Sequence, residues 1–354
     1  MRESGHRVLQ LEGGEPFIGT PDFVKEAMKA ALDANQTRYA PSSGIQPLLD
    51  ALVEKLARKN SVAVTRDDLI VTSGGAHGLF CAFQASVNPG DEVLFFAPYW
   101  TPIKDQVRYS GGIAVRVPWD EVRGENAGDL RQTLESRCTP KARVIYVNTP
   151  ANPSGDLLTR EQLTVVADFA KAHDLTVIAD EAYEDLVYDG EHVSIASLPG
   201  MLERTITVYT FSKSFSMTGW RIGYVVAPPQ FMAFIRKLVL NSVNGVSTPT
   251  QFAALAAVTH DPHFFDTIRE EYRRRRDRLV QGFRGAGFDC LTHPARSTPS
   301  PTSARGSAVT PGRRWRRCSS APPSPPSPGS CSVRKAKATC ACRSRRRWRR
   351  STRR

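Results

Sequence analysis

The sequence lacks the features of membrane and secreted proteins. It contains no apolar run of the roughly 20 residues that a membrane-spanning helix requires. Its first residues, MRESGHRVLQLEGGEP, contain no apolar stretch ahead of a small-residue cleavage site. We therefore predict a soluble, cytoplasmic protein without a membrane partner. The 354 residues are enough for a large domain and a smaller one.

Acidic residues are missing from the C-terminal part of the chain. The last one is Asp289, and residues 294–354 contain 17 lysines and arginines. The chain before residue 294 has 31 basic and 35 acidic residues, so the net charge of +13 comes from the tail. An arginine-rich tail can bind nucleic acid, but its aromatic residues are only Trp315 and Trp348. We expect no nucleic-acid partner.

Cysteines are few and scattered, which argues against a disulfide framework or a metal site. There are seven, and Cys81 and Cys138 lie in apolar or helical surroundings that suit reduced thiols. In the tail, Cys340 and Cys342 are too close together and lack a second pair. We predict no metal site.

Short apolar strands alternate with helical patterns and predict the fold class. Strands are expected at 69–75, 91–98, 143–150, 175–183, 205–213 and 221–228, and helices at 21–34, 44–60, 76–87, 160–174 and 251–288. This alternation indicates an α/β protein with a three-layer α/β/α large domain and a mostly parallel sheet. Ligands of such sheets bind beyond the carboxyl ends of the strands, where polar residues stand in this sequence.

The segment TFSKSFSMTGWRIGY, residues 210–224, carries the strongest motif. A lone Ser-Lys usually belongs to a surface loop, but here Gly-x-Arg-x-Gly follows it at residues 219–223. The segment resembles the lysine signature of the class I/II pyridoxal-phosphate-dependent aminotransferases of the aspartate aminotransferase type (fold type I). The resemblance extends from about Leu9 to about Leu291.

The resemblance implies roles for four residues of this segment. Lys213 would hold pyridoxal 5'-phosphate as a Schiff base and move the proton at the substrate's α-carbon. Arg221 would bind the phosphate through two hydrogen bonds. Thr210 and Ser212 would assist through their hydroxyl groups.

The segment VIADEAYEDLVY provides a second group of candidates. Asp180 ends an apolar strand, so its carboxylate should be partly desolvated, and by resemblance it would pair with the pyridinium nitrogen. Tyr183 would donate a hydrogen bond to the cofactor's phenolic oxygen. Glu181 is expected to face solvent or a helix N-terminus. Taken alone, the segment also fits a strand-to-helix cap.

Two strand-end loops complete the expected cofactor site. Asn152, in NTPANPSG, resembles the family asparagine that contacts the phenolic oxygen and the substrate carboxylate. In VTSGGAHGLF, the backbone amides of Gly75 and Ala76 would bind the phosphate at a helix N-terminus. Trp100, in APYWTP, would stack on the pyridine ring, although a core tryptophan is an equal alternative.

Two N-terminal segments also match the family. In LEGGEP, Gly14 would approach the substrate, together with Trp100 and Asn152. In TRYAPSSGIQPL, Tyr39 resembles the tyrosine that reaches the phosphate of the neighbouring subunit. The resemblance therefore implies a homodimer with shared sites.

The resemblance also implies a division into domains. Residues 1–38 would be the N-terminal segment of the small domain and 39–262 the large cofactor-binding domain. Residues 263–292 would begin the C-terminal part of a small α+β domain that is incomplete here. Residues 293–354, rich in Pro, Ser and Arg, would be a disordered tail read out of frame.

The C-terminal part departs from the family pattern. Neither the family's GAFY-like strand nor its HVRLS-like strand, whose arginine binds the substrate carboxylate, is present. Permitted codons for 294–304 and 335–346 spell GAFYPFADVS and GEGHVRLSFAA in an alternative frame. We therefore hypothesise a frame shift near His293. The start codon, close to the GEP loop, is also expected to be misassigned.

The predicted function is that of an aminotransferase. It would move an amino group from an L-amino acid, aspartate-type or similar, to a 2-oxo acid. Two alternatives remain open from the sequence: another fold-type-I pyridoxal-phosphate enzyme (a β-lyase, decarboxylase or synthase), or an inactive frame-shifted remnant. The sequence does not decide which amino acid is the donor.

Overall fold

The structure is a computed structural model that describes residues 14–122, 129–261, 263–288 and 295. They belong to the first of the two units into which the chain divides, Met1–Ser307 and Ala308–Arg354. Apart from residue 295, the predicted tail lies outside the described residues, and so does the hypothesised frame shift.

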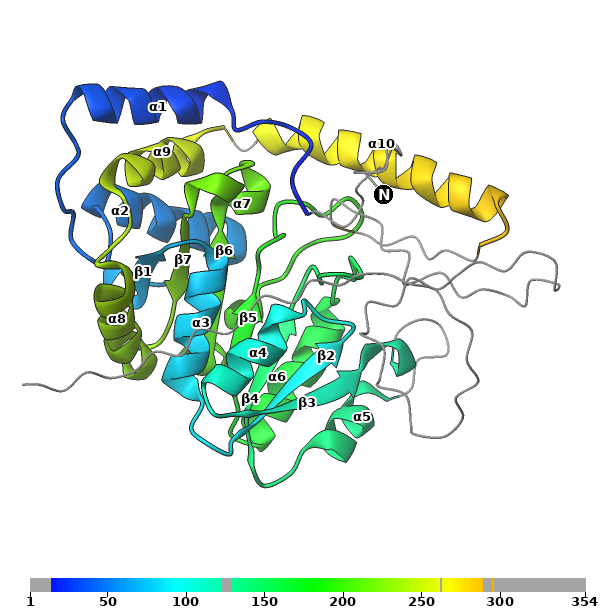
Figure 1. The fold of residues 1–354 in the computed structure, drawn as a ribbon. Coiled ribbons are helices and arrows are strands. Elements are labelled where there is room, and N and C mark those ends of the chain that lie inside the picture. The colour runs from blue at the N-terminus through cyan, green and yellow to red at the C-terminus, as the bar shows by residue number, and fades with distance from the viewer. Residues whose placement is uncertain (1–13, 123–128, 262, 289–294, 296–354) are drawn as a thin grey trace, which may run out of the picture. The chain divides into compact units, whose positions relative to one another are not determined.

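A seven-stranded sheet lies at the centre of the described unit, with the strand order β1-β7-β6-β5-β4-β2-β3 (Figure 1). The strands are β1 (Leu69–Thr72), β2 (Glu92–Ala97), β3 (Ile113–Pro118), β4 (Ala142–Asn148), β5 (Thr176–Asp180), β6 (Thr205–Thr210) and β7 (Gly223–Val226). Adjacent strands in the part of the sheet with the order β6-β5-β4-β2-β3 are parallel, whereas β7 is antiparallel to both β6 and β1. The prediction of a mostly parallel α/β sheet is confirmed.

Helices cover both faces of this sheet and give three layers. One face carries α3 (Gly75–Ser86), α4 (Pro102–Tyr109) and α8 (Pro229–Val243); the other carries α2 (Gln46–Lys55), α5 (Leu130–Arg137), α6 (Arg160–Ala172) and α9 (Thr248–Thr259). Side chains of a strand alternate between the faces. In β4, Val144 and Tyr146 pack in the core on the face covered by α3, α4 and α8, and Ile145 and Val147 pack in the core on the opposite face, under α5 and α6.

Three further helices complete the described unit: α1 (Asp22–Asp33), α7 (Phe211–Ser214) and α10 (Phe264–Gly285). α1 begins directly after Pro21 and lies along α9 (Figure 1). α2 continues into a π-helical turn, Leu56–Asn60, which ends at Ser61 in the left-handed conformation (φ 55°). None of the helices in the described ranges combines the length and the apolarity needed to cross a membrane.

Some element boundaries differ from the prediction. The strand expected at 205–213 ends at Thr210, and the residues after it form α7. The single helical pattern at 251–288 consists of two helices, α9 and α10, and the sequence has Pro262 between them. The prediction also omitted β3, α4, α5 and α8. β3 is an edge strand in which only Val117 is fully buried, so its apolar pattern is weak.

Candidate active site

Three neighbouring strands end in polar residues at one edge of the sheet. Asn148, which ends β4, lies beside Asp180, which ends β5. Thr210, which ends β6, leads directly into α7 and Lys213. Because parallel strands bring their carboxyl ends to a common edge, these side chains share one region. Far-separated parts of the sequence thus converge there, as the strand pattern predicts.

Lys213 lies on α7 and points toward the N-terminal segment. Its Nζ donates a hydrogen bond of 2.7 Å to the carbonyl oxygen of Gly14 and lies 6.0 Å from the ring centre of Tyr183. The Thr210 side chain caps α7 by accepting a hydrogen bond from the Ser212 amide, and its hydroxyl donates to the Ser212 hydroxyl at 2.9 Å. The structure therefore brings these five candidates into one neighbourhood.

Asp180 is a buried carboxylic acid with two hydrogen-bond donors. The Tyr146 hydroxyl donates to Oδ2 at 2.7 Å, and the Ala182 amide donates to Oδ1 at 3.2 Å. Burial raises the pKa of Asp180 to about 6, although both hydrogen bonds lower it. Burial also raises the pKa of Tyr146 well above its usual value, so this phenol keeps its proton and remains a donor. A cation beside Asp180 would favour its ionised form.

Hydrogen bonds connect Asp180 to the loop that carries Asn152. The side-chain amide of Asn148 donates to the Asp180 carbonyl oxygen at 2.9 Å, and its oxygen accepts from the Asn152 backbone amide at 2.7 Å. Asn152 Nδ2 in turn donates to the Tyr183 hydroxyl at 3.5 Å. Sequence reasoning missed Tyr146 and Asn148, although both are polar residues within an apolar strand.

The N-terminus of α3 forms a cradle with Arg221. Gly74 precedes this helix with φ +80°, and a Cβ there would lie 2.6 Å from Nη2 of Arg221. A Cβ on Gly75 would lie 3.3 Å from Cβ of Thr210. Free helix amides and a guanidinium group together favour an anion. Ala76, the other predicted phosphate contact, is in the first turn of α3, where its carbonyl oxygen accepts from Gln106 at 3.2 Å.

His77 supports this cradle and was also missed. Its Nδ1 accepts a hydrogen bond of 3.1 Å from the Ser73 amide, and its Nε2 lies 2.9 Å from the Ser242 hydroxyl. Because Nδ1 accepts, the proton of the neutral ring is on Nε2. Burial lowers the pKa of His77, which favours this neutral form. The ring therefore fixes the loop that leads into α3.

Two candidates lie apart from these contacts. Trp100 is half-buried in the loop between β2 and α4 and packs against the core beneath α3 and α4. Tyr39 is 88% exposed, so a single chain does not enclose its side chain in the site. It lines a surface depression formed by residues 37–40 and 243–249.

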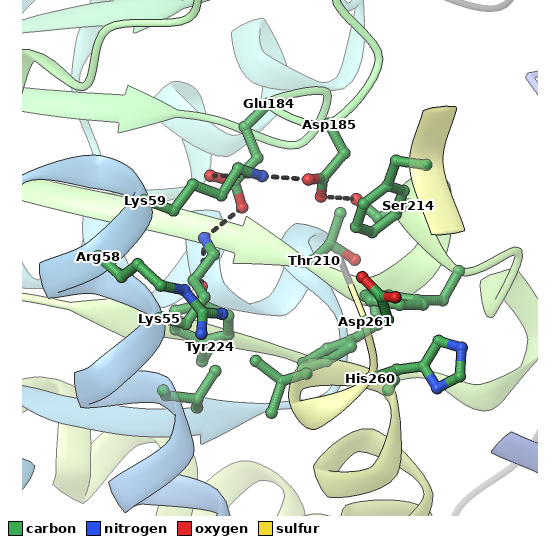
Figure 2. Close-up of a pocket in the computed structure, with 16 residues that line it drawn as sticks. Lys55, Arg58, Lys59, Glu184, Asp185, Thr210, Ser214, Tyr224, His260 and Asp261 are labelled. Atoms are coloured by element: carbon green, nitrogen blue, oxygen red, sulfur yellow. Dashed lines mark hydrogen bonds and ion pairs between the residues drawn. The ribbon is translucent and has the colours of Figure 1, made fainter. Parts of the chain in front are cut away.

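Behind the strand ends, buried acids are neutralised by lysines. Lys55 Nζ lies 2.5 Å from Glu184 Oε1, and Lys59 lies 3.7 Å from Oε2 of the same carboxylate (Figure 2). Although burial alone would raise the pKa of Glu184, these two ammonium groups hold it below its usual value. The buried charge is thus compensated within the protein.

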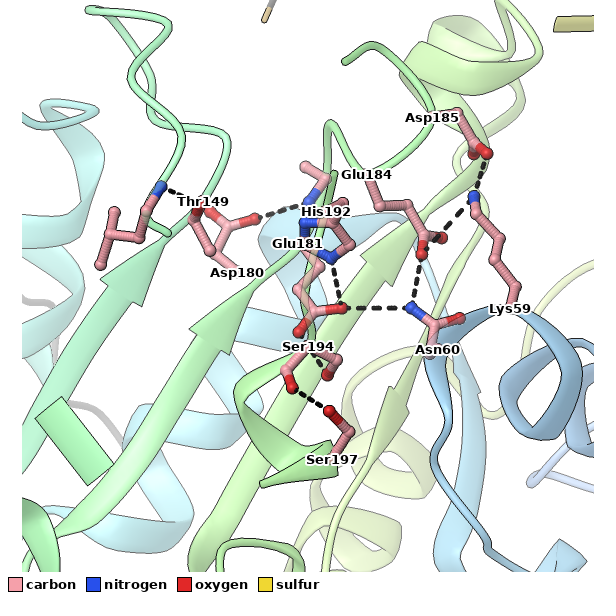
Figure 3. Close-up of polar contacts among 12 residues, drawn as sticks. Lys59, Asn60, Thr149, Asp180, Glu181, Glu184, Asp185, His192, Ser194 and Ser197 are labelled. Atoms are coloured by element: carbon pink, nitrogen blue, oxygen red, sulfur yellow. Dashed lines mark hydrogen bonds and ion pairs between the residues drawn. The ribbon is translucent and has the colours of Figure 1, made fainter. Parts of the chain in front are cut away.

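The expectation that Glu181 faces solvent or a helix N-terminus is wrong. Its side chain is 1% exposed and accepts a hydrogen bond of 2.6 Å from Ser194. His192 Nε2 lies 3.0 Å from the second carboxylate oxygen, and Asn60 Nδ2 donates to that oxygen at 3.4 Å (Figure 3). Asn60 also donates to Glu184 at 2.7 Å, which joins the two acids in one buried network.

Comparisons with known proteins identify the family and the fold. Residues 7–297 match the family model described as aminotransferase class I and II. The chain is 39% identical over 296 residues to the aspartate/prephenate aminotransferase of Thermus thermophilus, which covers 82% of this chain and 75% of that protein. It is 37% identical over 280 residues to the arginine–pyruvate transaminase of Pseudomonas aeruginosa, with 79% and 70% covered. A solved structure of aspartate aminotransferase from Thermus thermophilus with maleate is similar with a TM-score of 0.78 and 38% identity, covering 84% of this chain and 77% of that one.

Proposed function

The chain belongs to the aminotransferase class I and II family and is a transaminase, and we propose that Lys213, Asp180 and Tyr183 are its catalytic residues. The family uses pyridoxal phosphate to move an amino group between an amino acid and a 2-oxo acid. The observation that carries the proposal is the convergence of Lys213 with Gly14 and Tyr183 beside the strand end that holds Asp180.

The described residues fit this cofactor. When bound, pyridoxal phosphate supplies an electron sink for negative charge on the substrate's α-carbon. Asp180 would hold the ring nitrogen: its carboxyl is buried, has no ion-pair partner among the described residues, and has a pKa of about 6. A cationic nitrogen beside it would stabilise the carboxylate, and the carboxylate would keep that nitrogen protonated.

The cradle at α3 fits the phosphate group. The amides of Gly75 and Ala76 stand in the first turn of a 12-residue helix. Arg221 provides a guanidinium group, and Thr210 and Ser212 provide hydroxyl groups. Gly74 lies so close to Arg221 that no side chain fits between them. The anion would therefore contact the helix amides and the Arg221 guanidinium together.

Lys213 would provide the covalent attachment and the acid–base group. Its Nζ would accept the proton from the α-carbon of the amino donor. When the amino group is passed on, it would donate a proton to the carbon of the 2-oxo acid that receives it. The Gly14 carbonyl oxygen holds this nitrogen at 2.7 Å and so sets its direction. The Tyr183 hydroxyl, with Asn152 3.5 Å away, would donate to the cofactor's phenolic oxygen, and Trp100 would stack on the ring.

For the substrate we propose an aspartate-type amino donor. The support is the relative named aspartate/prephenate aminotransferase. An arginine–pyruvate transaminase of similar identity also matches, so this family accepts different side chains. Gly14, Trp100 and Asn152 would contact the substrate. Assays with aspartate, arginine and alanine as donors would rank them, and a preference for a donor other than aspartate would contradict this part.

The experiment that tests the cofactor proposal is an absorption spectrum of the purified chain with added pyridoxal phosphate. We expect a pH-dependent band near the visible edge that an amino acid bleaches. The band should be absent in Lys213→Ala and retained in Lys141→Ala, a control at an exposed lysine. No band in the unaltered chain, or an unchanged band in Lys213→Ala, would contradict the proposal.

We also propose that the protein is a homodimer in which Tyr39 serves the partner's site. The support is surface apolar area near Tyr39: Leu240 and Val243 on α8 are 47% and 38% exposed. Val243 lines the same depression as Tyr39. Light scattering on the purified chain tests this, and a monomer at working concentration would refute it. The cytoplasmic location stays a prediction.

Finally, we propose that the reading frame shifts near His293. The family match ends at residue 297, a few residues beyond that point. If so, the encoded chain lacks the family's arginine for the substrate carboxylate, and its affinity for amino acids should be low. Sequencing the gene through the codons for residues 288–304 decides this; codons that cannot spell GAFY in any frame would refute it. The division into large and small domains also stays a prediction.

A further inference from the structure

The helix that carries Lys213 cannot fix its own position. α7 has four residues, and its turn is closed by the Phe215 amide, which donates to the Phe211 carbonyl oxygen at 3.1 Å. One helical turn is unstable in isolation because nucleation fixes several backbone angles for a single hydrogen bond. The direction in which Lys213 leaves α7 therefore depends on contacts with the rest of the protein.

One of these contacts is a chain of three side chains next to Lys213, of which Ser214 and Asp185 are buried and Lys59 is partly exposed. The Ser214 hydroxyl donates to Oδ2 of Asp185 at 2.5 Å, and Lys59 Nζ donates to Oδ1 of the same carboxylate (Figure 2). Ser214 and Asp185 are 3% and 6% exposed. Both oxygens of Asp185 are thus engaged, one by α7 and one by the π-helical turn after α2.

Asp185 belongs to the turn that also carries Tyr183. The Glu184 amide donates to the Glu181 carbonyl oxygen at 3.2 Å, and the Leu186 amide donates to the Tyr183 carbonyl oxygen at 2.9 Å. These hydrogen bonds fold residues 181–186 into a compact turn directly after Asp180. Any contact between Asp185 and α7 therefore fixes α7 relative to Asp180 and Tyr183.

We propose that Asp185 is a positioning residue: anchored by Lys59, it holds Ser214 and thereby fixes the direction of Lys213 relative to Tyr183. This inference rests on the proposed function of Lys213. Reacting groups must be held to about 1 Å for efficient catalysis. Asp185 has the charge, the burial and the two occupied oxygens to supply this constraint to a helix that cannot supply it alone.

The test measures the reactivity of Lys213 without the cofactor. The full chain, free of pyridoxal phosphate, is treated with trace amine-reactive reagent over a range of pH. Mass spectrometry of peptides then gives the rate at Lys213 relative to Lys141, an exposed lysine that serves as internal reference. The variants are Ser214→Ala, Asp185→Asn and Asp185→Ala. Asp50→Asn, at an exposed carboxylate paired with Arg66, is the matched control.

We expect the relative rate at Lys213 to rise because a loosened α7 releases Nζ from the Gly14 carbonyl oxygen. Loss of a buried hydrogen bond to a charged group shifts an equilibrium by about tenfold. We expect a rise of about tenfold in Ser214→Ala, which removes this bond, and of about tenfold or more in Asp185→Ala. Asp185→Asn should lie between the unaltered chain and Asp185→Ala, because an amide oxygen still accepts from Ser214.

A role in stability alone would lower the unfolding midpoint and leave the rate at Lys213 unchanged in the folded variants; that result would overturn the proposal. If Asp185→Ala does not fold, Ser214→Ala and Asp185→Asn decide by the same criterion. The proposed function fails separately: a chain that gives no absorption band with pyridoxal phosphate refutes the role of Lys213 in cofactor binding, whatever its labelling rate.

Discussion

Replacing Tyr146 by phenylalanine should change how the stability of the cofactor-free chain depends on pH. The substitution keeps the aromatic ring in its core and removes the hydroxyl that donates to Asp180 Oδ2 at 2.7 Å. A buried carboxylate that loses a donor becomes harder to ionise. The effect should therefore be an increase in the pKa of Asp180, which already lies at about 6 because of burial.

The direction and size of the expected change in stability follow from the coupling between proton binding and folding. The folded-state pKa of Asp180 exceeds its ordinary value of 3.8, so between these two values the folded chain binds more protons, and stability falls as pH rises. A hydrogen bond to a charged group contributes about 1.5–3 kcal/mol, and about 1.4 kcal/mol equals one pKa unit. Tyr146→Phe should thus raise the pKa by roughly one to two units, and stability should continue to fall up to about pH 7–8.

Urea unfolding of the cofactor-free chain at several pH values measures this. We expect the free energies of unfolding of Tyr146→Phe and the unaltered chain to differ by about 1.5–3 kcal/mol more at about pH 8.5 than at about pH 5. Tyr109→Phe, at a tyrosine that is 77% exposed, is the control and should show no such difference. A loss of stability in Tyr146→Phe that is the same at all pH values would refute the reasoning.

Two further predictions concern the cradle and the buried charges. Gly74→Ala should weaken binding of pyridoxal phosphate roughly tenfold in a fluorescence titration, because the new Cβ would displace the Arg221 guanidinium and strain a φ of +80°. Gly90→Ala is the control, because Gly90 has a φ of +90° but open space around it. Equal affinities in the two variants would contradict the prediction. Lys55→Met should lower the free energy of unfolding at neutral pH by about 3–5 kcal/mol, because Glu184 loses its nearest ammonium group inside the protein. This loss of stability should shrink as Glu184 becomes protonated in acid. A loss of stability that does not depend on pH would show that the lysine acts through packing.

Much of the sheet could be predicted because its strands are apolar and end in polar residues. β5 and β6 are buried except for Thr176 at the start of β5 and Thr210 at the end of β6, and this produces the continuous apolar runs seen in the sequence. The edge strand β3 has mostly half-exposed residues, so its sequence does not stand out. α7 was taken for part of β6 because a four-residue helix is too short for helical periodicity to appear.

The contacts of the candidate site that the prediction missed depend on residues far apart in the sequence. Tyr146 is in contact with a carboxylate 34 residues away, and nothing in the local sequence of β4 indicates that its hydroxyl has this partner. The burial of Glu181 was missed because it lies just past Asp180, where β5 ends and the strand pattern no longer indicates the direction of a side chain. Its partners His192 and Ser194 come from a later segment whose path the sequence pattern does not define.

The neighbouring acids at the end of β5 show why Asp180 in particular is suited to a cationic ligand. Glu184 is buried but has Lys55 at 2.5 Å, so its charge is balanced inside the protein. Asp180 is equally buried, yet among the described residues it has only the neutral donors Tyr146 and Ala182. Leaving a buried carboxylate without a cation costs stability, and a pKa raised to about 6 is the measure of that cost. A ligand that brings a positive charge to Asp180 would recover this free energy on binding, so the same residue that destabilises the empty protein would favour a protonated pyridine ring over a neutral one.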